Sequence, residues 1–231
     1  MSATNRKRAD GSVYKRRPAD YYSTPEWVTE SALNRFETRY PDMSWDRVLE
    51  PAAGNGAITR VMRRKRQVKH LTTVEIMPSR SIALKLYTRP NRHYAGDFRS
   101  FANLEARKGT KYSVILTNPP FSHAEAFVMR SLSLLRPDGY LALLLRLAFL
   151  ESQERAEMHR KYPSDVFVLP RRPSFTGDGQ SDMSAYAWFV WGPGCGGRWE
   201  VLPTTSVLGE RFFDITSSML IPGPCLPLST R

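Results

Sequence analysis

The spacing of apolar positions along the chain switches repeatedly between two periods. Short runs of apolar and β-branched residues predict strands, and these runs are residues 47–50, 71–76, 93–95, 112–117, 140–147, 165–169 and 185–191. Apolar residues three or four positions apart predict helices, and this spacing covers residues 24–40, 57–66, 78–87, 122–135 and 151–161. Because strands and helices alternate from residue 47 to 169, we expect an α/β fold with a parallel sheet and helices on both faces.

Local signals mark the start of two of these helices. Ser23 or Thr24 is expected to cap the first helix, with Pro25 in its first position. Ser122 and Glu125 have the spacing of a capping box at the start of the helix over 122–135. The turn at 137–139 then leads into a strand that is apolar on nearly every residue, which predicts burial on both faces.

The chain divides into three parts by composition. Residues 1–20 are polar, basic and without hydrophobic periodicity, so we expect a flexible N-terminal arm. Residues 21–191 contain every predicted strand and helix and are expected to form one domain. Residues 192–231 are rich in Gly, Pro, Ser and Thr and are expected to form a short appendage.

The charge balance points to a polyanionic partner. Lys and Arg number 34 against 22 Asp and Glu, a net charge of +12. Part of the excess is clustered at Arg63, Arg64 and Lys65, where phosphate contacts with nucleic acid are expected. The alternative is a basic protein whose charge serves solubility alone.

Other compositional features exclude function classes. The chain has no apolar run long enough to span a bilayer, so we expect no membrane partner. Its two cysteines make neither a disulfide framework nor a metal cluster, which is typical of a cytoplasmic protein without a metal site.

Polar and glycine-rich segments follow four of the predicted strands. They are residues 50–56, Glu75, residues 96–98 and residues 118–121. In open α/β sheets ligands bind beyond the carboxyl ends of the strands, so we expect these segments to form one cleft.

The first three segments have the residue types of an adenosine site. Gly54 and Gly56 let the backbone approach a ligand closely, although the third glycine of a dinucleotide fingerprint is missing. Glu75 lies about 20 residues after Gly54, where an acid binds ribose hydroxyls. Asp97 can accept from an adenine amine while Phe98 packs on the ring. The alternatives are a structural turn, a solvated carboxylate and a core aromatic.

The fourth segment, Asn118-Pro119-Pro120-Phe121, is the most specific signal. Two consecutive prolines make the loop rigid. The Asn118 side-chain oxygen and the Pro119 carbonyl can both accept hydrogen bonds from one planar amino group, which localises the lone pair of its nitrogen. Phe121 offers a flat face on which a base can stack. The alternative is a loop that only ends a buried strand.

In this order, the motifs at 24–26, 50–56 and 118–121 resemble those of the class I S-adenosylmethionine-dependent methyltransferases. The resemblance covers about residues 21–191. It is strongest to the phage-type and orphan DNA adenine N-6 methyltransferases with the gamma motif order. It implies a Rossmann-like, seven-stranded, mostly parallel sheet. The implied reaction transfers a methyl group from S-adenosylmethionine to the 6-amino group of adenine in DNA, after the base is extruded.

The resemblance also implies roles for individual residues. The cofactor-binding residues would be Tyr21, Thr24, Glu50, Ala52, Gly54, Glu75, Ile76, Asp97, Phe98 and Asn118. The catalytic loop would be Asn118, Pro119, Pro120 and Phe121. Substrate contacts would come from Phe121, from Phe175 as a second aromatic on the extruded base, and from Arg63, Arg64 and Lys65. Neither a metal nor a covalent nucleophile is required.

Three rival functions share parts of this pattern. An RNA adenine methyltransferase can carry the same loop, and the sequence hardly separates it from a DNA enzyme. A protein glutamine methyltransferase usually has Tyr in place of Phe121. A non-catalytic nucleic-acid-binding module would need neither Glu75 nor Asn118. Because relatives with the gamma order usually add a sizeable recognition domain, the short segment 192–231 predicts weak or very short sequence preference.

Overall fold

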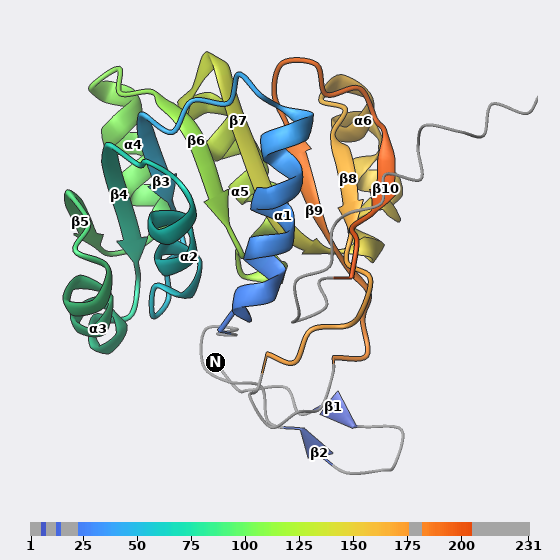
Figure 1. Ribbon diagram of the computed structural model, residues 1–231, viewed down its shortest axis with the longest axis horizontal. Coiled ribbons are helices and arrows are strands. Elements are labelled where there is room, and N and C mark those ends of the chain that lie inside the picture. Colours follow the sequence, from blue (N-terminus) through green and yellow to red (C-terminus); the bar gives the residue numbers. More distant parts are fainter. Residues whose placement is uncertain (1–5, 8–12, 15–22, 176–181, 205–231) are drawn as a thin grey trace, which may run out of the picture.

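The computed structural model describes residues 6–7, 13–14, 23–175 and 182–204, and its central feature is a sheet between two layers of helices (Figure 1). The eight strands have the order β10-β8-β9-β7-β6-β3-β4-β5. They are β3 (Arg47–Glu50), β4 (His70–Glu75), β5 (Arg92–Ala95), β6 (Tyr112–Thr117), β7 (Leu135–Arg146), β8 (Asp165–Val168), β9 (Tyr186–Trp191) and β10 (Trp199–Val201). All neighbours pair in parallel except β9, which is antiparallel to β7 and β8. The expected Rossmann-like α/β fold is confirmed.

The helices cover the two faces of the sheet in two groups of three. Helices α1 (Glu26–Arg39), α2 (Ala57–Lys65) and α3 (Pro78–Thr88) lie on one side, and α4 (Phe98–Arg107), α5 (Ala124–Leu134) and α6 (Gln153–Lys161) lie on the other (Figure 1). Two short 3-10 turns, η2 (Phe121–His123) and η3 (Leu147–Leu150), follow β6 and β7. Near the N-terminus, β1 (Arg6–Lys7) and β2 (Val13–Tyr14) form a separate antiparallel pair, and most of the expected arm over 1–20 lies outside the described residues.

Strand β7 shows why the sheet must be covered by helices on both faces. Ala142 and Leu144 belong to the core cluster beneath α1 and α2, whereas Leu141, Leu143 and Leu145 belong to the cluster beneath α4 and α5. Since side chains alternate across a strand, a strand that is apolar at every position has to bury both faces.

The structure corrects the expected strand count. Seven strands are predicted from the sequence, but residues 199–201 add an eighth, β10, which pairs in parallel with β8. This strand has three residues and stands at the edge of the sheet. Its existence depends on the exposed edge of β8 rather than on a local pattern.

Four local expectations also differ from the structure. The stretch at 98–107 is a helix that was not predicted, with Asp97 as its N-cap. The expected capping box at Ser122 is wrong, because residues 121–123 form a 3-10 turn and α5 begins after His123. The expected turn at 137–139 lies within the bounds of β7 but outside its ladder, because the pairing with β6 passes from Leu135 directly to Tyr140. Helix α1 begins at Glu26, one residue later than expected, with Pro25 in the cap position.

A buried tryptophan fixes α1 against the sheet. Trp188 on β9 is fully buried, and its indole Nε1 donates to the Val28 carbonyl at 3.0 Å. This hydrogen bond joins residues 160 positions apart. It sets the position of the first turn of α1 and of Thr24 just before it.

We therefore expect Trp188→Ala to lower the free energy of unfolding by about 3–5 kcal/mol, because it leaves a large cavity. Trp188→Phe should cost about 1–2 kcal/mol, since it loses mainly the hydrogen bond to Val28. Urea denaturation followed by circular dichroism measures both. Trp199→Ala is the control, because Trp199 is 75% exposed. An equal cost at positions 188 and 199 would contradict this role.

Candidate active site

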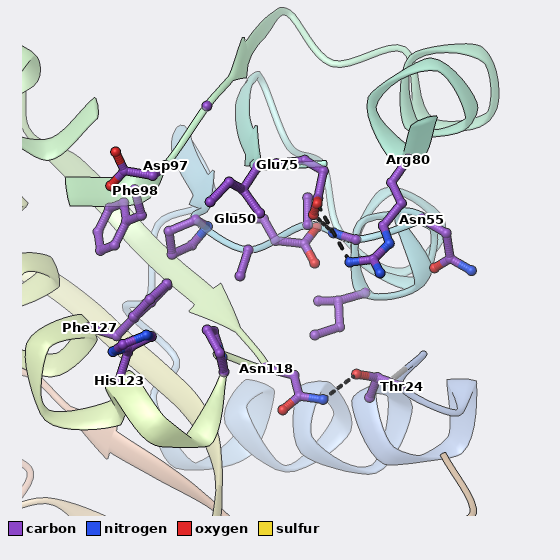
Figure 2. A pocket seen from close by; sticks show the side chains of 18 of the residues that line it. Thr24, Glu50, Asn55, Glu75, Arg80, Asp97, Phe98, Asn118, His123 and Phe127 are labelled. Atoms are coloured by element: carbon purple, nitrogen blue, oxygen red, sulfur yellow. Dashed lines mark hydrogen bonds and ion pairs between the residues drawn. The ribbon is translucent and has the colours of Figure 1, made fainter. Parts of the chain in front are cut away.

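A cavity of about 410 Å³ opens at the carboxyl edge of the sheet (Figure 2). Parallel pairing of β3 with β4 and of β4 with β5 brings the ends of these strands together. The cavity is lined by residues from all four segments that the sequence singles out, among them Glu50, Ala52, Gly54, Glu75, Ile76, Asp97, Phe98 and Asn118. The expected cleft is therefore present.

Glu75 holds the glycine turn against the end of β4. Its Oε2 accepts from the Gly54 backbone N–H at 2.8 Å, and its Oε1 accepts from the Met77 N–H at 2.8 Å. Gly54 has a φ of 55°, a left-handed conformation that favours glycine. Glu75 is 4% exposed, and its Oε1 lies 3.8 Å from Arg80 Nη1. The carboxylate is fixed at the wall of the cavity.

Glu50 places a second carboxyl group in the cavity wall, without exposure to solvent. Its Oε2 accepts from the Thr59 hydroxyl, while its Oε1 has no hydrogen-bond partner among the described residues. Burial raises the pKa of Glu50 to about 8. A buried acceptor without a partner costs stability, so this oxygen is available to a ligand that donates to it.

Asp97 is engaged by the start of α4. Its Oδ1 accepts from the Arg99 and Ser100 N–H groups, and its Oδ2 accepts from the Ser100 hydroxyl. The hydrogen bond from Ser100 holds the pKa of Asp97 below its usual value. Since these bonds fix the carboxylate as a helix cap, an adenine amine would have to share oxygens that already accept.

Two aromatic rings form the apolar end of the cavity. Phe98 packs on Phe127 with ring centroids 4.8 Å apart. His123, just before α5, and Phe127 and Arg130 within it also line the cavity. Figure 2 shows His123 and Phe127 near Phe98. Sequence reasoning assigned Phe127 only to the core face of its helix. The i, i+4, i+7 spacing of these three residues indicates a shared face, but not which part of the fold that face meets.

Asn118 joins the rigid loop to the start of α1. Its Nδ2 donates to the Thr24 hydroxyl at 3.1 Å (Figure 2). Its buried Oδ1 has no hydrogen-bond partner among the described residues. Because the nitrogen is fixed by Thr24, the orientation of the remaining oxygen is fixed as well. Pro120 lines the cavity beside it.

Phe121 lies on the other side of the loop and outside the lining of the cavity. Its ring packs on Tyr186 with centroids 5.5 Å apart, and the Arg146 guanidinium lies 4.8 Å from its centre. Phe175 is 5% exposed and contacts the same Tyr186 edge-on. The two aromatics expected to stack on the base, Phe121 and Phe175, therefore lie together around Tyr186 and Arg146. Sequence reasoning did not assign Tyr186 or Arg146 to the site.

The other expected residues lie elsewhere. Arg63, Arg64 and Lys65 form the last turn of α2, outside the lining of the cavity. Arg64 pairs with Glu26 and Glu30 at 3.0 and 2.7 Å. Tyr21 is outside the described residues.

Two further classes of feature were searched for in the described part of the chain. It contains no group of three or more His, Cys, Asp or Glu side chains arranged to hold a metal ion. No helix within it combines the length and apolar character that a membrane span requires.

Comparison with known proteins gives one family and many similar folds. The family model described as "Methyltransferase small domain" matches residues 30–161. No curated protein sequence matches the chain. Many solved structures share the fold.

Three of these structures illustrate the likeness. A candidate class I S-adenosylmethionine-dependent methyltransferase from Listeria monocytogenes has a TM-score of 0.58 at 14% identity, over 78% of this chain and 65% of its own. A candidate RNA methyltransferase from Pyrococcus horikoshii has a TM-score of 0.58 at 14% identity, over 76% and 90%. An O-methyltransferase from Bacillus cereus in complex with SAH has a TM-score of 0.55 at 12% identity, over 77% and 84%. At these identities the likeness shows the fold alone.

The raised pKa of Glu50 predicts how stability depends on pH. The folded state keeps the Glu50 proton up to about pH 8, whereas the unfolded state releases it near 4.5. Between these values the unfolded state binds fewer protons, so this group lowers stability as pH rises, by about 3 kcal/mol at pH 7.

Glu50→Gln should remove this dependence. Urea unfolding of the ligand-free protein at intervals between pH 5 and 8.5, roughly the span of this titration, gives the curve for each protein. The difference in free energy between Glu50→Gln and the natural chain should grow with pH. Parallel curves would show that Glu50 is ionised in the folded protein.

Proposed function

Because the chain belongs to the methyltransferase small domain family and is an S-adenosylmethionine-dependent methyltransferase, we propose that it methylates the 6-amino group of adenine in DNA. The observation that carries this proposal is the unpartnered Asn118 Oδ1, on a rigid Asn-Pro-Pro-Phe turn beside the cavity. A buried acceptor held in one orientation suits a planar amino group that has a hydrogen to donate.

The residues of the cavity fit the cofactor. The unpartnered Glu50 Oε1 is an acceptor for the ammonium group, and the glycine turn at Gly54 leaves room for close approach. Glu75 lies where ribose hydroxyls can donate to its carboxylate, and the Phe98–Phe127 pair offers an apolar surface to the adenine. When bound, S-adenosylmethionine supplies an electrophilic methyl group and a positive charge, which favours the ionised form of Glu50.

Asn118 then orients the amino group that accepts the methyl group. Its Oδ1 accepts one N–H, and the Pro119 carbonyl accepts the other. Both bonds draw the nitrogen toward tetrahedral geometry and turn its lone pair out of the ring. The hydrogen bond to Thr24 prevents the Asn118 amide from rotating. Asn118 can therefore orient the amino group at little entropic cost.

Phe121 is the proposed surface for the extruded base. Phe121 ends the turn that begins at Asn118, and its ring packs on Tyr186. The Arg146 guanidinium over the ring occupies a place where a purine could stack. Entry of the base would move Arg146 from this face, and the base–aromatic contact would offset part of the cost of extrusion.

The net charge of +12 supports nucleic acid as the substrate, because it favours a polyanionic partner.

The test of substrate class is transfer of radiolabelled methyl groups to DNA, RNA and protein in parallel, followed by separation of the modified nucleosides. Label in N6-methyldeoxyadenosine supports the proposal. Label in N6-methyladenosine would assign the RNA alternative, and label in neither would overturn it.

Asn118→Ala should lower kcat by at least about 100-fold, by analogy with the loss of one oriented hydrogen-bonding group at a reaction centre. Cofactor affinity, measured by isothermal titration calorimetry, should stay within about threefold. Asn118→Asp is the matched variant, because it keeps an acceptor of the same size and should retain more activity than Asn118→Ala. Full activity of Asn118→Ala would exclude this mechanism.

Phe121→Ala should raise KM for DNA by about tenfold through loss of base stacking, while Phe121→Tyr should stay near the natural value. Steady-state kinetics at saturating cofactor separates KM from kcat. An unchanged KM in Phe121→Ala would place the base elsewhere.

A further inference from the structure

A second, open cleft of about 450 Å³ lies between α2 and the end of α3, which pack side by side (Figure 1). It is lined by Arg60, Arg63, Arg64, Tyr87, Thr88 and Arg89. Four of these six described lining residues carry guanidinium groups, and none is acidic. Such a surface attracts an anion that presents several charges in a row.

The cleft adjoins the active site through a short series of contacts. Arg60 donates to the Asn55 carbonyl at 3.0 Å, and Asn55 donates to the Ser23 hydroxyl at 3.3 Å. The next residue, Thr24, accepts from Asn118 at 3.1 Å. These contacts place the cleft a few residues from Asn118, on the side of Ser23 and Asn55.

Arg89 occupies a backbone position that normally favours glycine. It is the cap residue after α3, and its φ of 42° is the only positive φ of a non-glycine residue in the described part of the chain. An L side chain in this left-handed conformation costs stability, and Gly is the usual residue there. Strained positions of this kind cluster at functional sites.

The Arg89 side chain shows no structural reason for that cost. Its carbonyl accepts from Arg63 at 3.0 Å, a bond that glycine would keep. Its guanidinium forms no hydrogen bond or ion pair with the described residues. A ligand of the guanidinium would give position 89 a reason to be arginine rather than glycine.

Tyr87 is the aromatic residue of the cleft. It is 72% exposed, and its ring contacts no other ring or cation among the described residues. The neighbouring Arg64 pairs with Glu26 and Glu30, but these pairs are exposed and contribute little, so a phosphate can replace them. Exposed aromatics among arginines are the pattern by which proteins bind unpaired bases and their phosphates.

We propose that this cleft binds the single-stranded DNA segment next to the target adenine, with one unpaired base stacked on Tyr87 and phosphates bound by Arg60 and Arg89. The proposal rests on the proposed function and adds to it that the flanking strand is unpaired. A duplex would offer phosphates to the arginines but no free base to Tyr87.

The stacking contact is tested by fluorescence anisotropy with a labelled single-stranded oligodeoxynucleotide that carries one central adenine. Tyr87→Ala should weaken binding by about tenfold, and Tyr87→Phe should keep the affinity within about twofold. The natural protein should bind the single strand more tightly than the duplex of the same sequence. Because Tyr87 is exposed, neither variant should lower the melting temperature by more than about 2 °C.

Arg89→Gly separates a ligand-binding role from a structural one. Relief of the left-handed strain should raise the melting temperature by about 2–4 °C. Loss of a phosphate contact should lower affinity and reduce the salt slope of log K by about 0.7. Arg107→Ala is the control for net charge, because Arg107 is an exposed arginine at the end of α4 on the other side of the sheet. It should change the slope by less than half as much as Arg89→Gly.

Several outcomes would overturn the inference. One is equal affinity for single strand and duplex, and another is natural affinity in both Tyr87→Ala and Arg89→Gly. A third is displacement of the oligonucleotide by polyglutamate as effectively as by unlabelled DNA, which would make the cleft a general anion surface.

The same variants separate this inference from the proposed function. If the natural protein methylates adenine while Tyr87→Ala and Arg89→Gly bind and methylate normally, the cleft proposal alone fails. If binding changes as expected but no adenine is methylated in any substrate, the proposed function fails, and only the binding of single-stranded DNA by Tyr87 and Arg89 stands.

Discussion

Parallel pairing of β3 with its neighbours β4 and β6 is the constraint on which the site depends. The three strands are buried on both faces, so the charged side chains of β3 and β4 lie at the strand ends. Because parallel strands end at the same edge, Glu50, Glu75 and Asn118 converge on one cavity. The chemistry of the site therefore follows from the direction in which three short strands run.

Hydrogen bonds then decide which atoms of this cavity remain available. Both oxygens of Glu75 accept backbone N–H groups, and the Asn118 amide nitrogen donates to Thr24. These bonds fix the side chains and leave single acceptors, Glu50 Oε1 and Asn118 Oδ1, without partners among the described residues. Unpartnered buried acceptors destabilise a fold, so their presence at one cavity points to ligands that donate to them.

Some of the residues proposed to contact the substrate also lower the stability of the fold. Arg89 has a left-handed backbone where glycine would be more stable, and Tyr87 leaves most of its ring in solvent. Arg146 lies over the ring of Phe121. Proteins tolerate such local departures from the most stable arrangement mainly where function requires them. The cofactor cavity is built on fixed strand ends, whereas the proposed nucleic-acid contacts come from exposed side chains around it.

The amino-acid sequence by itself determined the order of strands and helices, apart from α4 and β10, and the segments at the strand ends, because hydrophobic period and turn residues are local properties. It therefore indicated the fold and most of the residues that line the cavity. Only the tertiary structure decided which side chains meet across the chain. The pairing of β10 with β8, the packing of Phe121 on Tyr186 and the entry of Phe127 into the cavity wall join distant segments. The 3-10 turn in place of the Ser122 capping box also depends on how the loop packs. Such contacts depend on the relative positions of whole elements, and no local pattern encodes those positions.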